Sequence, residues 1–330
     1  MADFDNRFVA LKKESAYGTP AGSFVFGEVD DESIRHTYDL MTREDMSRYG
    51  SSKSVTGKEF SAGSVNMAMI GDEFTGNILM GMMGTDTVGS ISGGFYPHTF
   101  TEAGTLASYT FLVSREDKEH LYKGCVIDSL SVSAALNEYA SVSFNMMGKS
   151  EDIASLAAAG TTSPTFPDSL DPLYFSNAKV FFNGNATASD AVADISFDIN
   201  LNRDGDNACA LGSTTYVRAP PVQRREVTGT ITFNKVVHST SVAEPTYTQL
   251  TTQDGLEFAG SGVELKVQFG DDTTADLLTF NFYKIRFEAA DANVSGRDTN
   301  TMSVNFVALF SSADSKMMDI VLRSTKSSSF

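Results

Sequence analysis

Residues 194–202 read DISFDINLN, and this stretch shows the pattern that dominates the chain. Ile195, Phe197 and Ile199 alternate with polar residues at every second position. A period of two with one polar face predicts a strand that packs one side on a core, as in antiparallel sheets. The same alternation recurs at residues 141–146, 227–234, 263–269 and 302–306. Many such strands, joined by glycine-rich turns, predict a mainly β fold of the sandwich or barrel type.

Helical patterns are few. Asp72 can cap a helix over residues 73–83, which carries apolar residues on one face and ends before Gly84. A second helix is expected over residues 245–257, so that each half of the chain has one flanking helix. A short helical turn is expected over residues 151–159.

A proline-rich segment divides the chain near its middle. Residues 157–172 contain three of the eight prolines, a composition typical of an interdomain linker. We therefore expect a first domain over residues 1–156 and a second over residues 173–330. Residues 1–22 are expected to form an N-terminal arm that becomes ordered only in an assembly.

The two halves carry short similar motifs in the same order, about 160 to 172 residues apart. The pairs are LMTRE at 40–44 with NLNRD at 200–204, VTG at 55–57 with VTG at 227–229, and SVSF at 141–144 with SVNF at 303–306. The two expected helices fall between the second and third pairs. This common order predicts an internal duplication. The alternative is that strand-like tetrapeptides recur by chance in a β protein.

Charge and cysteine content exclude several classes of protein. The chain has 25 Lys and Arg against 42 Asp and Glu, a net charge of −17, which disfavours a surface that grips nucleic acid phosphates. Two cysteines without CxxC spacing give no disulfide framework and indicate a reducing compartment. We expect no signal peptide and no membrane span, because no apolar run reaches the required length.

Motifs for catalysis or metal binding are not recognised in this sequence. The four histidines show no metal-ligand spacing, and neither a HExxH helix nor a GxSxG elbow occurs. Gly81 to Gly94 is glycine-rich but lacks the Lys-Ser/Thr of a phosphate loop. We therefore expect no enzymatic activity, no metal and no cofactor.

Several short segments together resemble the major tail tube proteins of long-tailed, siphovirus-type bacteriophages. They are KKESAYGTP at residues 12–20, YPHTF at 96–100, YKGCVIDSL at 122–130 and VSG at 294–296. The resemblance covers nearly the whole chain and rests on structural rather than catalytic motifs. It implies β-sandwich domains with a flanking helix, and subunits that close into stacked rings around a DNA-conducting lumen.

The resemblance also implies partners and a location. With a duplicated chain, rings would be trimers with pseudo-sixfold symmetry; without a duplication, they would be hexamers. Further expected partners are the tape-measure protein and the tail terminator and tip proteins, with DNA only passing through. The protein would be made in the cytoplasm of the host bacterium and reside in the tail of the virion. The alternative function is a virion decoration protein or a host-binding adhesin with two β-sandwich domains.

Two long charged connections lie at equivalent places in the two halves. They are expected to form ion pairs between stacked rings, as the corresponding hairpin loops of the family do; the alternative is an ordinary solvated loop. The candidate residues are Arg43, Glu44, Asp45, Arg48 and Lys53 in the first connection, and Arg203, Asp204, Asp206, Arg218, Arg224 and Arg225 in the second. The acidic balance would keep DNA away from the lumen wall, or serve only to keep the free subunit soluble.

Overall fold

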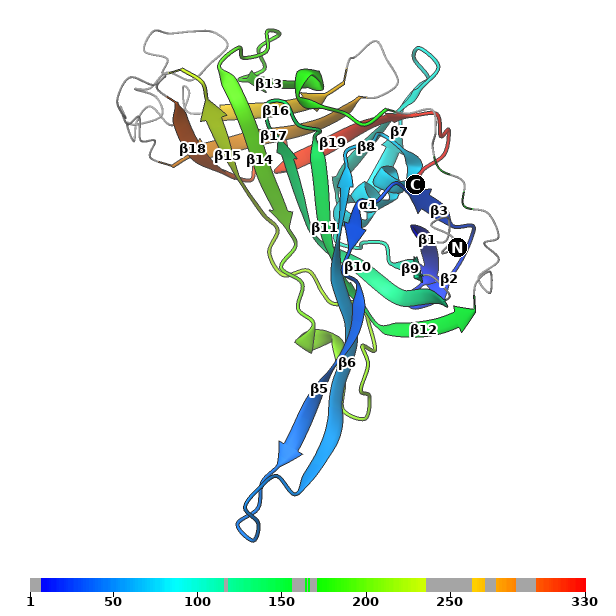
Figure 1. Cartoon of the computed structure of the whole chain (residues 1–330). Coiled ribbons are helices and arrows are strands. Elements are labelled where there is room, and N and C mark those ends of the chain that lie inside the picture. Colours follow the sequence, from blue (N-terminus) through cyan, green and yellow to red (C-terminus); the bar gives the residue numbers. More distant parts are fainter. Residues whose placement is uncertain are drawn as a thin grey trace.

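The computed structural model of the protein describes residues 7–115, 118–155, 164, 166, 171–235, 263–270, 277–288 and 301–330. These residues form mainly antiparallel strands with one α-helix, which confirms the expected mainly β fold (Figure 1). The expected helix over residues 245–257 and most of the expected linker lie outside the described residues. A tandem duplication and a sandwich or barrel arrangement stay predictions.

Among the described residues, the first half of the chain contains the helix and twelve strands. Their bounds are β1 Phe8–Ala16, β2 Thr19–Pro20, β3 Val25–Gly27, β4 Asp31–Glu32, β5 Arg35–Arg43, β6 Lys53–Ala68, α1 Glu73–Met83, β7 Gly84–Val88, β8 Tyr96–Glu102, β9 Tyr109–Arg115, β10 Lys118–Ala134, β11 Ser141–Gly148 and β12 Ser150–Ser155. For residues 151–155 the expected helical turn is wrong, because residues 150–155 pair with β10 as β12; residues 156–159 lie outside the described residues.

The second half contributes seven strands among the described residues. Their bounds are β13 Ala178–Phe182, β14 Val192–Asn200, β15 Glu226–Phe233, β16 Val263–Phe269, β17 Leu278–Phe287, β18 Met302–Ala308 and β19 Met318–Ser324. Short 3₁₀ turns precede β13, at Phe175–Asn177, and follow β14, at Asp206–Ala208.

Most strands join one open sheet that runs through both halves. From one end its order is β5, β6, β11, β10, β14, β15, β18 and β17. At β17 the sheet branches, with β16 and β13 on one side and β19, β8 and β7 on the other. Two of these pairings, β10 with β14 and β19 with β8, join strands of the first half to strands of the second.

Strand β10 belongs to two sheets. Its second half lies in the large sheet, whereas Lys118 to Lys123 lie between β9 and β12 in a smaller sheet that continues to β1 and β3. The bend between them is a bulge that contains Gly124, whose φ of +64° favours glycine. A Cβ atom at Gly124 would also come within 2.9 Å of Lys149.

Helix α1 confirms the sequence prediction at both of its ends. The Asp72 carboxylate accepts the backbone N–H of Thr75 at 2.8 Å, and Gly84 ends the helix in the left-handed conformation. Burial raises the pKa of Asp72 to about 6. The helix packs under the sheets, and Phe74, Ile78 and Met82 join a hydrophobic core that continues into the second half.

Residues of the N-terminal arm expected from the sequence take part in the smaller sheet. Val9, Ala10 and Leu11 of β1 are buried, and β1 pairs with β9 on one side and β3 on the other. Residues 1–6 lie outside the described residues. An arm that becomes ordered on assembly stays a prediction for that part.

Candidate assembly surfaces

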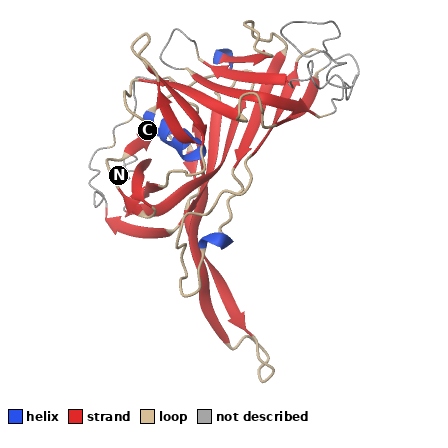
Figure 2. Ribbon diagram, turned by 180° about the vertical axis from the view of Figure 1, so that it is seen from behind, coloured by secondary structure: helices blue, strands red, loops and turns tan. Residues whose placement is uncertain are grey.

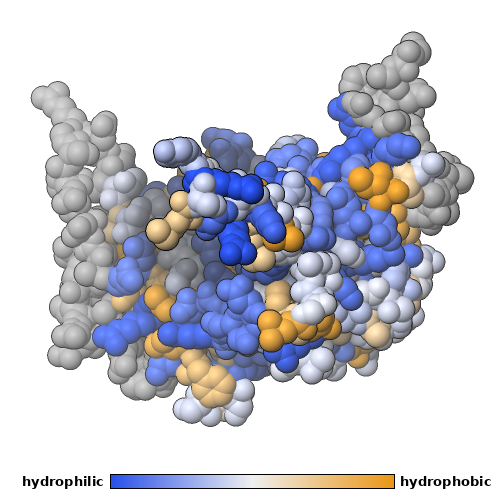
Figure 3. Space-filling model, turned by 90° about the horizontal axis from the view of Figure 1, so that it is seen from below, coloured by the Kyte–Doolittle hydropathy of each residue, from blue (hydrophilic) through white to orange (hydrophobic). Residues whose placement is uncertain are grey.

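The β5–β6 hairpin extends from the body of the molecule as a long arm (Figures 1 and 2). No strand of the described residues lies beside its outer half, and apolar side chains are exposed along it. They are Tyr38, Leu40, Met41, Met46, Tyr49 and Val55, of which Met46 and Tyr49 are fully exposed. Seen from the side toward which the hairpin extends, the molecule shows separate hydrophobic patches on a hydrophilic surface (Figure 3). Exposed apolar groups on a strand hairpin are typical of an interaction surface.

The charged residues predicted for the first connection lie at the tip of this hairpin. Arg43, Glu44, Arg48 and Lys53 are exposed, and the structure gives them no ion pair with another described residue. Asp45 instead accepts the backbone N–H of Ser47 at 3.1 Å. Hydrogen bonds from Ser47 and Ser52 lower the pKa of the Asp45 carboxyl. The tip therefore presents four charged groups to whatever lies next to it.

The second connection, predicted from Arg203 to Glu226, corresponds to the segment 201–225 between β14 and β15 and lies against the stem of the hairpin. The backbone N–H of Glu59 donates to the carbonyl of Thr214 at 2.7 Å, and Lys58 pairs with Asp206 at 2.7 Å. The second connection thus contacts the stem of the hairpin at Lys58 and Glu59 and not the predicted first connection at its tip.

Arg203 is buried at the start of the second connection. Its Nε donates to the carbonyl of Ile127 at 2.6 Å and its Nη1 to the carbonyl of Pro220 at 2.7 Å. Its backbone N–H donates to the Asp128 carboxylate at 2.9 Å. Burial lowers the pKa of the guanidinium to about 10. These contacts tie the connection to the middle of β10.

The other predicted residues of this connection differ in exposure and partners. Asp204 accepts the backbone N–H groups of Asp206 and Asn207, and the hydrogen bonds from Asn207 lower its pKa. Arg218 donates to the carbonyl of Asn207 at 2.6 Å. Arg224 is exposed, 3.4 Å from Glu226.

Arg225 lies deeper than its neighbour Arg224. It forms an ion pair of 3.3 Å with Glu102 and donates to the carbonyl of Met82, at the end of α1. Its contacts therefore join the second connection to the helix and to β8.

A polar face of the large sheet is a feature that the sequence analysis did not identify. It consists of short polar side chains that alternate with the core residues, and several of them form hydrogen bonds across strands. They are Ser64, Asn66, Ser129, Ser131, Ser133, Ser141, Ser143, Asn145, Ser196, Asp198, Asn200, Thr228, Thr230, Thr232, Ser303 and Asn305. Ser133 and Ser141 are 2.7 Å apart between their hydroxyl oxygens, and Thr230 donates to Asn305 at 2.9 Å.

No basic residue lies in the strand segments that carry the polar face. Residues 61–68, 126–134, 141–148, 192–200, 226–233 and 302–308 contain no lysine or arginine, but they do contain Asp128, Asp194, Asp198 and Glu226. The serine, threonine and asparagine pattern is visible in the sequence of each strand. Its continuity depends on the strand order, which brings together segments from both halves.

A comparison with protein families shows which family the chain belongs to. A family model described as phage tail tube protein matches residues 5–308. The chain belongs to the phage tail tube protein family. Members of this family are structural components of the virion, so the chain is a structural tail tube protein. No curated protein matches the chain.

Two further observations concern other kinds of site in this tail tube protein. The part of the chain that the structure describes contains no group of three or more His, Cys, Asp or Glu side chains placed to hold a metal ion. Within the same part, α1 is too short to cross a membrane, and the structure has no longer helix.

Proposed function

We propose that the protein closes into rings that stack into the hollow tube of a siphovirus-type phage tail, with the polar face turned toward the lumen. The observation that carries this proposal is the absence of lysine and arginine from the strand segments of the polar face. DNA is held mainly by contacts between its phosphates and basic side chains. A wall without such side chains lets DNA pass without being bound.

The hydrogen bonds within the polar face support the same role. Ser129 accepts the amide of Asn145 at 2.8 Å, and Ser133 pairs with Ser141. Side chains that satisfy one another across strands have fewer free donors for phosphate oxygens. The carboxylates of Asp194, Asp198 and Glu226 add repulsion at short range, which salt weakens beyond about 10 Å.

The strand order supports an internal duplication. Next to one another lie β4, β6, β11 and β10 in the first half, and β14, β15, β18 and β17 in the second. Phe144 of SVSF is opposite Leu130, as Phe306 of SVNF is opposite Phe287. We infer two equivalent wedges per chain, and hence trimeric rings with pseudo-sixfold symmetry; hexameric rings are the alternative.

The short VTG repeat does not follow this alignment. Val55 lies in the protruding part of the β5–β6 hairpin, whereas Val227 pairs with Ile199 inside the sheet. When the strands of the two halves are aligned, the protruding part of the β5–β6 hairpin in the first half corresponds to residues 201–225 in the second. Strand order and the SVSF and SVNF pair are therefore the features that support the duplication.

The hairpin tip is proposed to contact the next ring of the stack. Arg43, Arg48 and Lys53 present charges there, and Met46 and Tyr49 present apolar surface. Arg224 of the second connection is exposed and belongs to the same proposal. The tape-measure, terminator and tip proteins are proposed as the other partners of the tube.

Electron microscopy of the purified protein at rising concentration tests this function. We expect hollow tubes whose end-on views have threefold symmetry that approximates sixfold. True sixfold views would keep the tube and remove the duplication. A protein that stays monomeric at every concentration and binds host glycans would instead support the adhesin.

A further inference from the structure

Residues 325–330, here called the strap, follow β19 and return to helix α1 (Figure 1). The side chain of Phe330 is buried on the helix at Gly76, where a Cβ atom would come within 2.3 Å of its ring. The centroid of this ring is 4.6 Å from that of the His98 ring and 5.8 Å from that of Phe100. Phe330 is therefore the apolar anchor of a segment that has no regular secondary structure.

Polar contacts from three strands of the first half hold the strap in this position. Lys13 of β1 donates to the backbone oxygen of Phe330 at 2.7 Å. The backbone N–H of Phe330 donates to Oδ2 of Asp86, on β7, at 3.0 Å. Nε2 of His98, on β8, is 2.8 Å from the carbonyl oxygen of Lys326. The strap thus joins the end of the second half to the first half.

His98 is fully buried and has an acceptor at each of its ring nitrogens. Nδ1 is 2.9 Å from Oδ2 of Asp86, whose side chain is also fully buried, and Nε2 faces the carbonyl of Lys326. A carbonyl oxygen can only accept a hydrogen bond, so Nε2 carries a proton. An ionised carboxylate also only accepts, so Nδ1 carries a second proton when Asp86 is charged. The hydrogen-bond network then assigns the imidazolium form to His98.

The other contacts of Asp86 favour its ionised form. Its Oδ2 accepts the Phe330 N–H in addition to facing His98. Burial and the nearby Lys326 ammonium lower the pKa of Lys13, and the charge of Asp86 opposes this effect. Hydrogen-bond donors and a neighbouring cation both stabilise a carboxylate over a carboxylic acid. The buried pair is therefore an imidazolium with a carboxylate.

The remaining charged groups near His98 come from α1, β19 and the strap. Lys326 forms an ion pair with Glu73 at the start of α1. Arg323 of β19 is one residue beyond the position opposite His98. Of the carboxylates in the described part of the chain, Asp86 is the one that lies within hydrogen-bond distance of the His98 ring. Its charge is the one that the second proton on His98 compensates.

We propose that the strap is a lock held shut by the second proton on His98, and that loss of this proton opens the strap and uncovers the site of Phe330 on α1. Without that proton, one ring nitrogen presents a lone pair to the Lys326 carbonyl or to the Asp86 carboxylate. An unmade contact of this kind is costly in a buried site. The closed strap thus binds more protons than the open one, so the contribution of His98 is full at low pH and is lost as the pH rises. The lock lies within one subunit and does not depend on assembly into a tube.

Nitrogen NMR of protein labelled with ¹⁵N-histidine tests the protonation of the ring. Protonated nitrogens and nitrogens with a lone pair resonate in separate ranges, and His98→Gln assigns the signals of His98. At pH 7 we expect protons on both of its nitrogens. Phe330→Ala, which loosens the strap without changing the ring, should lose the second proton at a lower pH. A single neutral tautomer of His98 in the folded wild type at pH 7 would overturn the lock.

Cleavage after Lys326 by a lysine-specific protease measures the opening of the strap, and mass spectrometry identifies the cut. Because the protease itself depends on pH, each rate is divided by that of His98→Gln at the same pH. The glutamine amide can donate to the Lys326 carbonyl and does not titrate. Between pH 6 and pH 9 this ratio should rise by about fivefold or more. A ratio that stays constant would contradict a lock held by a proton.

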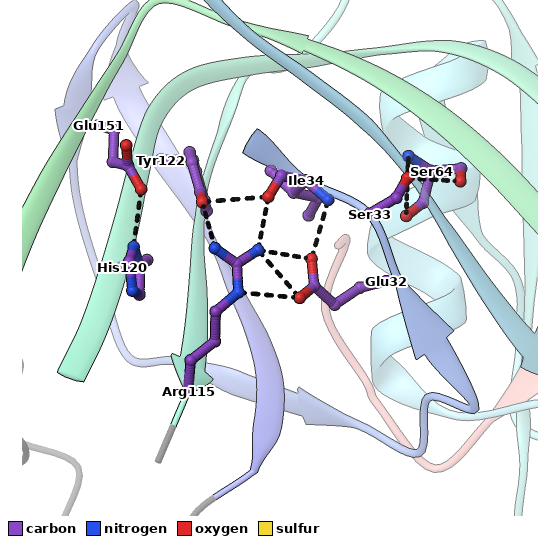
Figure 4. Close-up of polar contacts among 8 residues, drawn as sticks. All are labelled: Glu32, Ser33, Ile34, Ser64, Arg115, His120, Tyr122 and Glu151. Atoms are coloured by element: carbon purple, nitrogen blue, oxygen red, sulfur yellow. Dashed lines mark hydrogen bonds and ion pairs between the residues drawn. The ribbon is translucent and has the colours of Figure 1, made fainter. Parts of the chain in front are cut away.

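His120 provides the matched control. Its Nδ1 is 2.7 Å from Oε1 of Glu151, and a single proton on Nδ1 satisfies that contact (Figure 4). His120→Gln should leave the cleavage after Lys326 unchanged at every pH. Thermal unfolding establishes that each variant is folded. If His120→Gln changed the cleavage as much as His98→Gln, the pH dependence would not arise at the strap, and the proposal would fail.

Discussion

Phe60 of β6 stacks on Tyr216 of the second connection, with ring centroids 6.1 Å apart and an interplanar angle of 21°. Tyr216 is 1% exposed, although it lies in a segment without regular strands. This contact holds the connection against the stem of the protruding hairpin. It gives the hairpin a rigid base, although no third strand of the described residues lies beside its outer half.

Tyr216→Ala should therefore destabilise the protein, by about 3–5 kcal/mol for the loss of a large buried side chain. Chemical denaturation measures the free energy of unfolding. Tyr49→Ala, at the exposed tip, should leave that free energy within about 0.5 kcal/mol of the wild type. Equal effects of the two substitutions would mean that the connection is not anchored through Tyr216.

Asp72 makes stability depend on pH in an unusual direction. Its pKa in the folded protein is about 6, above the usual 3.8, so between these values the folded state binds more protons than the unfolded state. Its contribution is fully present below about pH 4 and is lost as the pH rises through 6. Asp72→Asn keeps a capping oxygen without this titration.

The asparagine variant should thus gain about 3 kcal/mol relative to the wild type between pH 4 and pH 7. Urea denaturation of both proteins at several pH values measures the difference. A difference that stays constant over this range would show that Asp72 does not titrate as its burial implies.

Gly76 is required for close packing on α1. A Cβ atom there would come within 2.3 Å of the Phe330 ring. In an open helix Ala would be more favourable than Gly by about 1 kcal/mol, but here the clash should reverse the sign. We expect Gly76→Ala to lower the melting temperature, and Phe330→Ala to remove that effect in a double-mutant cycle.

Gly50 offers the matched control for this substitution. It lies in the hairpin tip, where a Cβ atom would meet nothing within 4 Å. Gly50→Ala should leave the melting temperature unchanged. If Gly76→Ala were equally neutral, Phe330 would not pack against the helix as described.

Charge reversal at the hairpin tip tests the contact between rings. Arg43→Glu with Arg48→Glu should block stacking. Acidic groups on the facing ring that pair with the wild-type arginines would repel the two glutamates. The fold should be unaffected, since both side chains are exposed. Electron microscopy should show single rings or free subunits, whereas Lys179→Glu, an exposed change in β13, should give normal tubes. Normal tubes from the doubly reversed protein would remove these arginines from the interface.

Lysine on the polar face should turn the lumen wall into a DNA-binding surface. Ser143→Lys with Thr230→Lys adds two cations per chain where the wild type has none. Assembled tubes of this variant should retain short DNA at low salt and release it as salt rises. Ser143→Gln with Thr230→Gln is the control of similar bulk. Equal retention by both variants would place the polar face outside the lumen.

The sequence predicted the strands of this fold better than their order. Alternation identified β11, β14, β15, β16 and β18, and the cap and stop residues Asp72 and Gly84 identified α1. The alternation of polar and apolar residues shows which face of a strand is buried, but it does not show which strand lies next to it. The pairing of β10 with β14, which unites the halves, could not be predicted because it joins segments 61 to 71 residues apart with no turn signal between them.

The candidate residues show a similar limit. Arg203 and Arg224 look alike in the sequence, yet one is buried against Ile127 and Pro220 and the other is exposed. The contacts among Glu32, Arg115 and Tyr122 were also missed, because these residues meet only through the path of the chain (Figure 4). The number and sign of the charged residues do not show which of them lie close together in the fold.

The pairing of β6 with β11 determines how the protein resists a pull on its protruding arm. Its upper part is bonded to β11 over eight consecutive residue pairs, from Ser61 to Ala68, and its lower part continues into the protruding arm. A pull on the arm along its length therefore acts in shear. The hydrogen bonds of that ladder share the load together and do not open one after another, as they would if the strand were peeled sideways. The long overlap between β6 and β11 therefore anchors the arm to the body against a lengthwise pull.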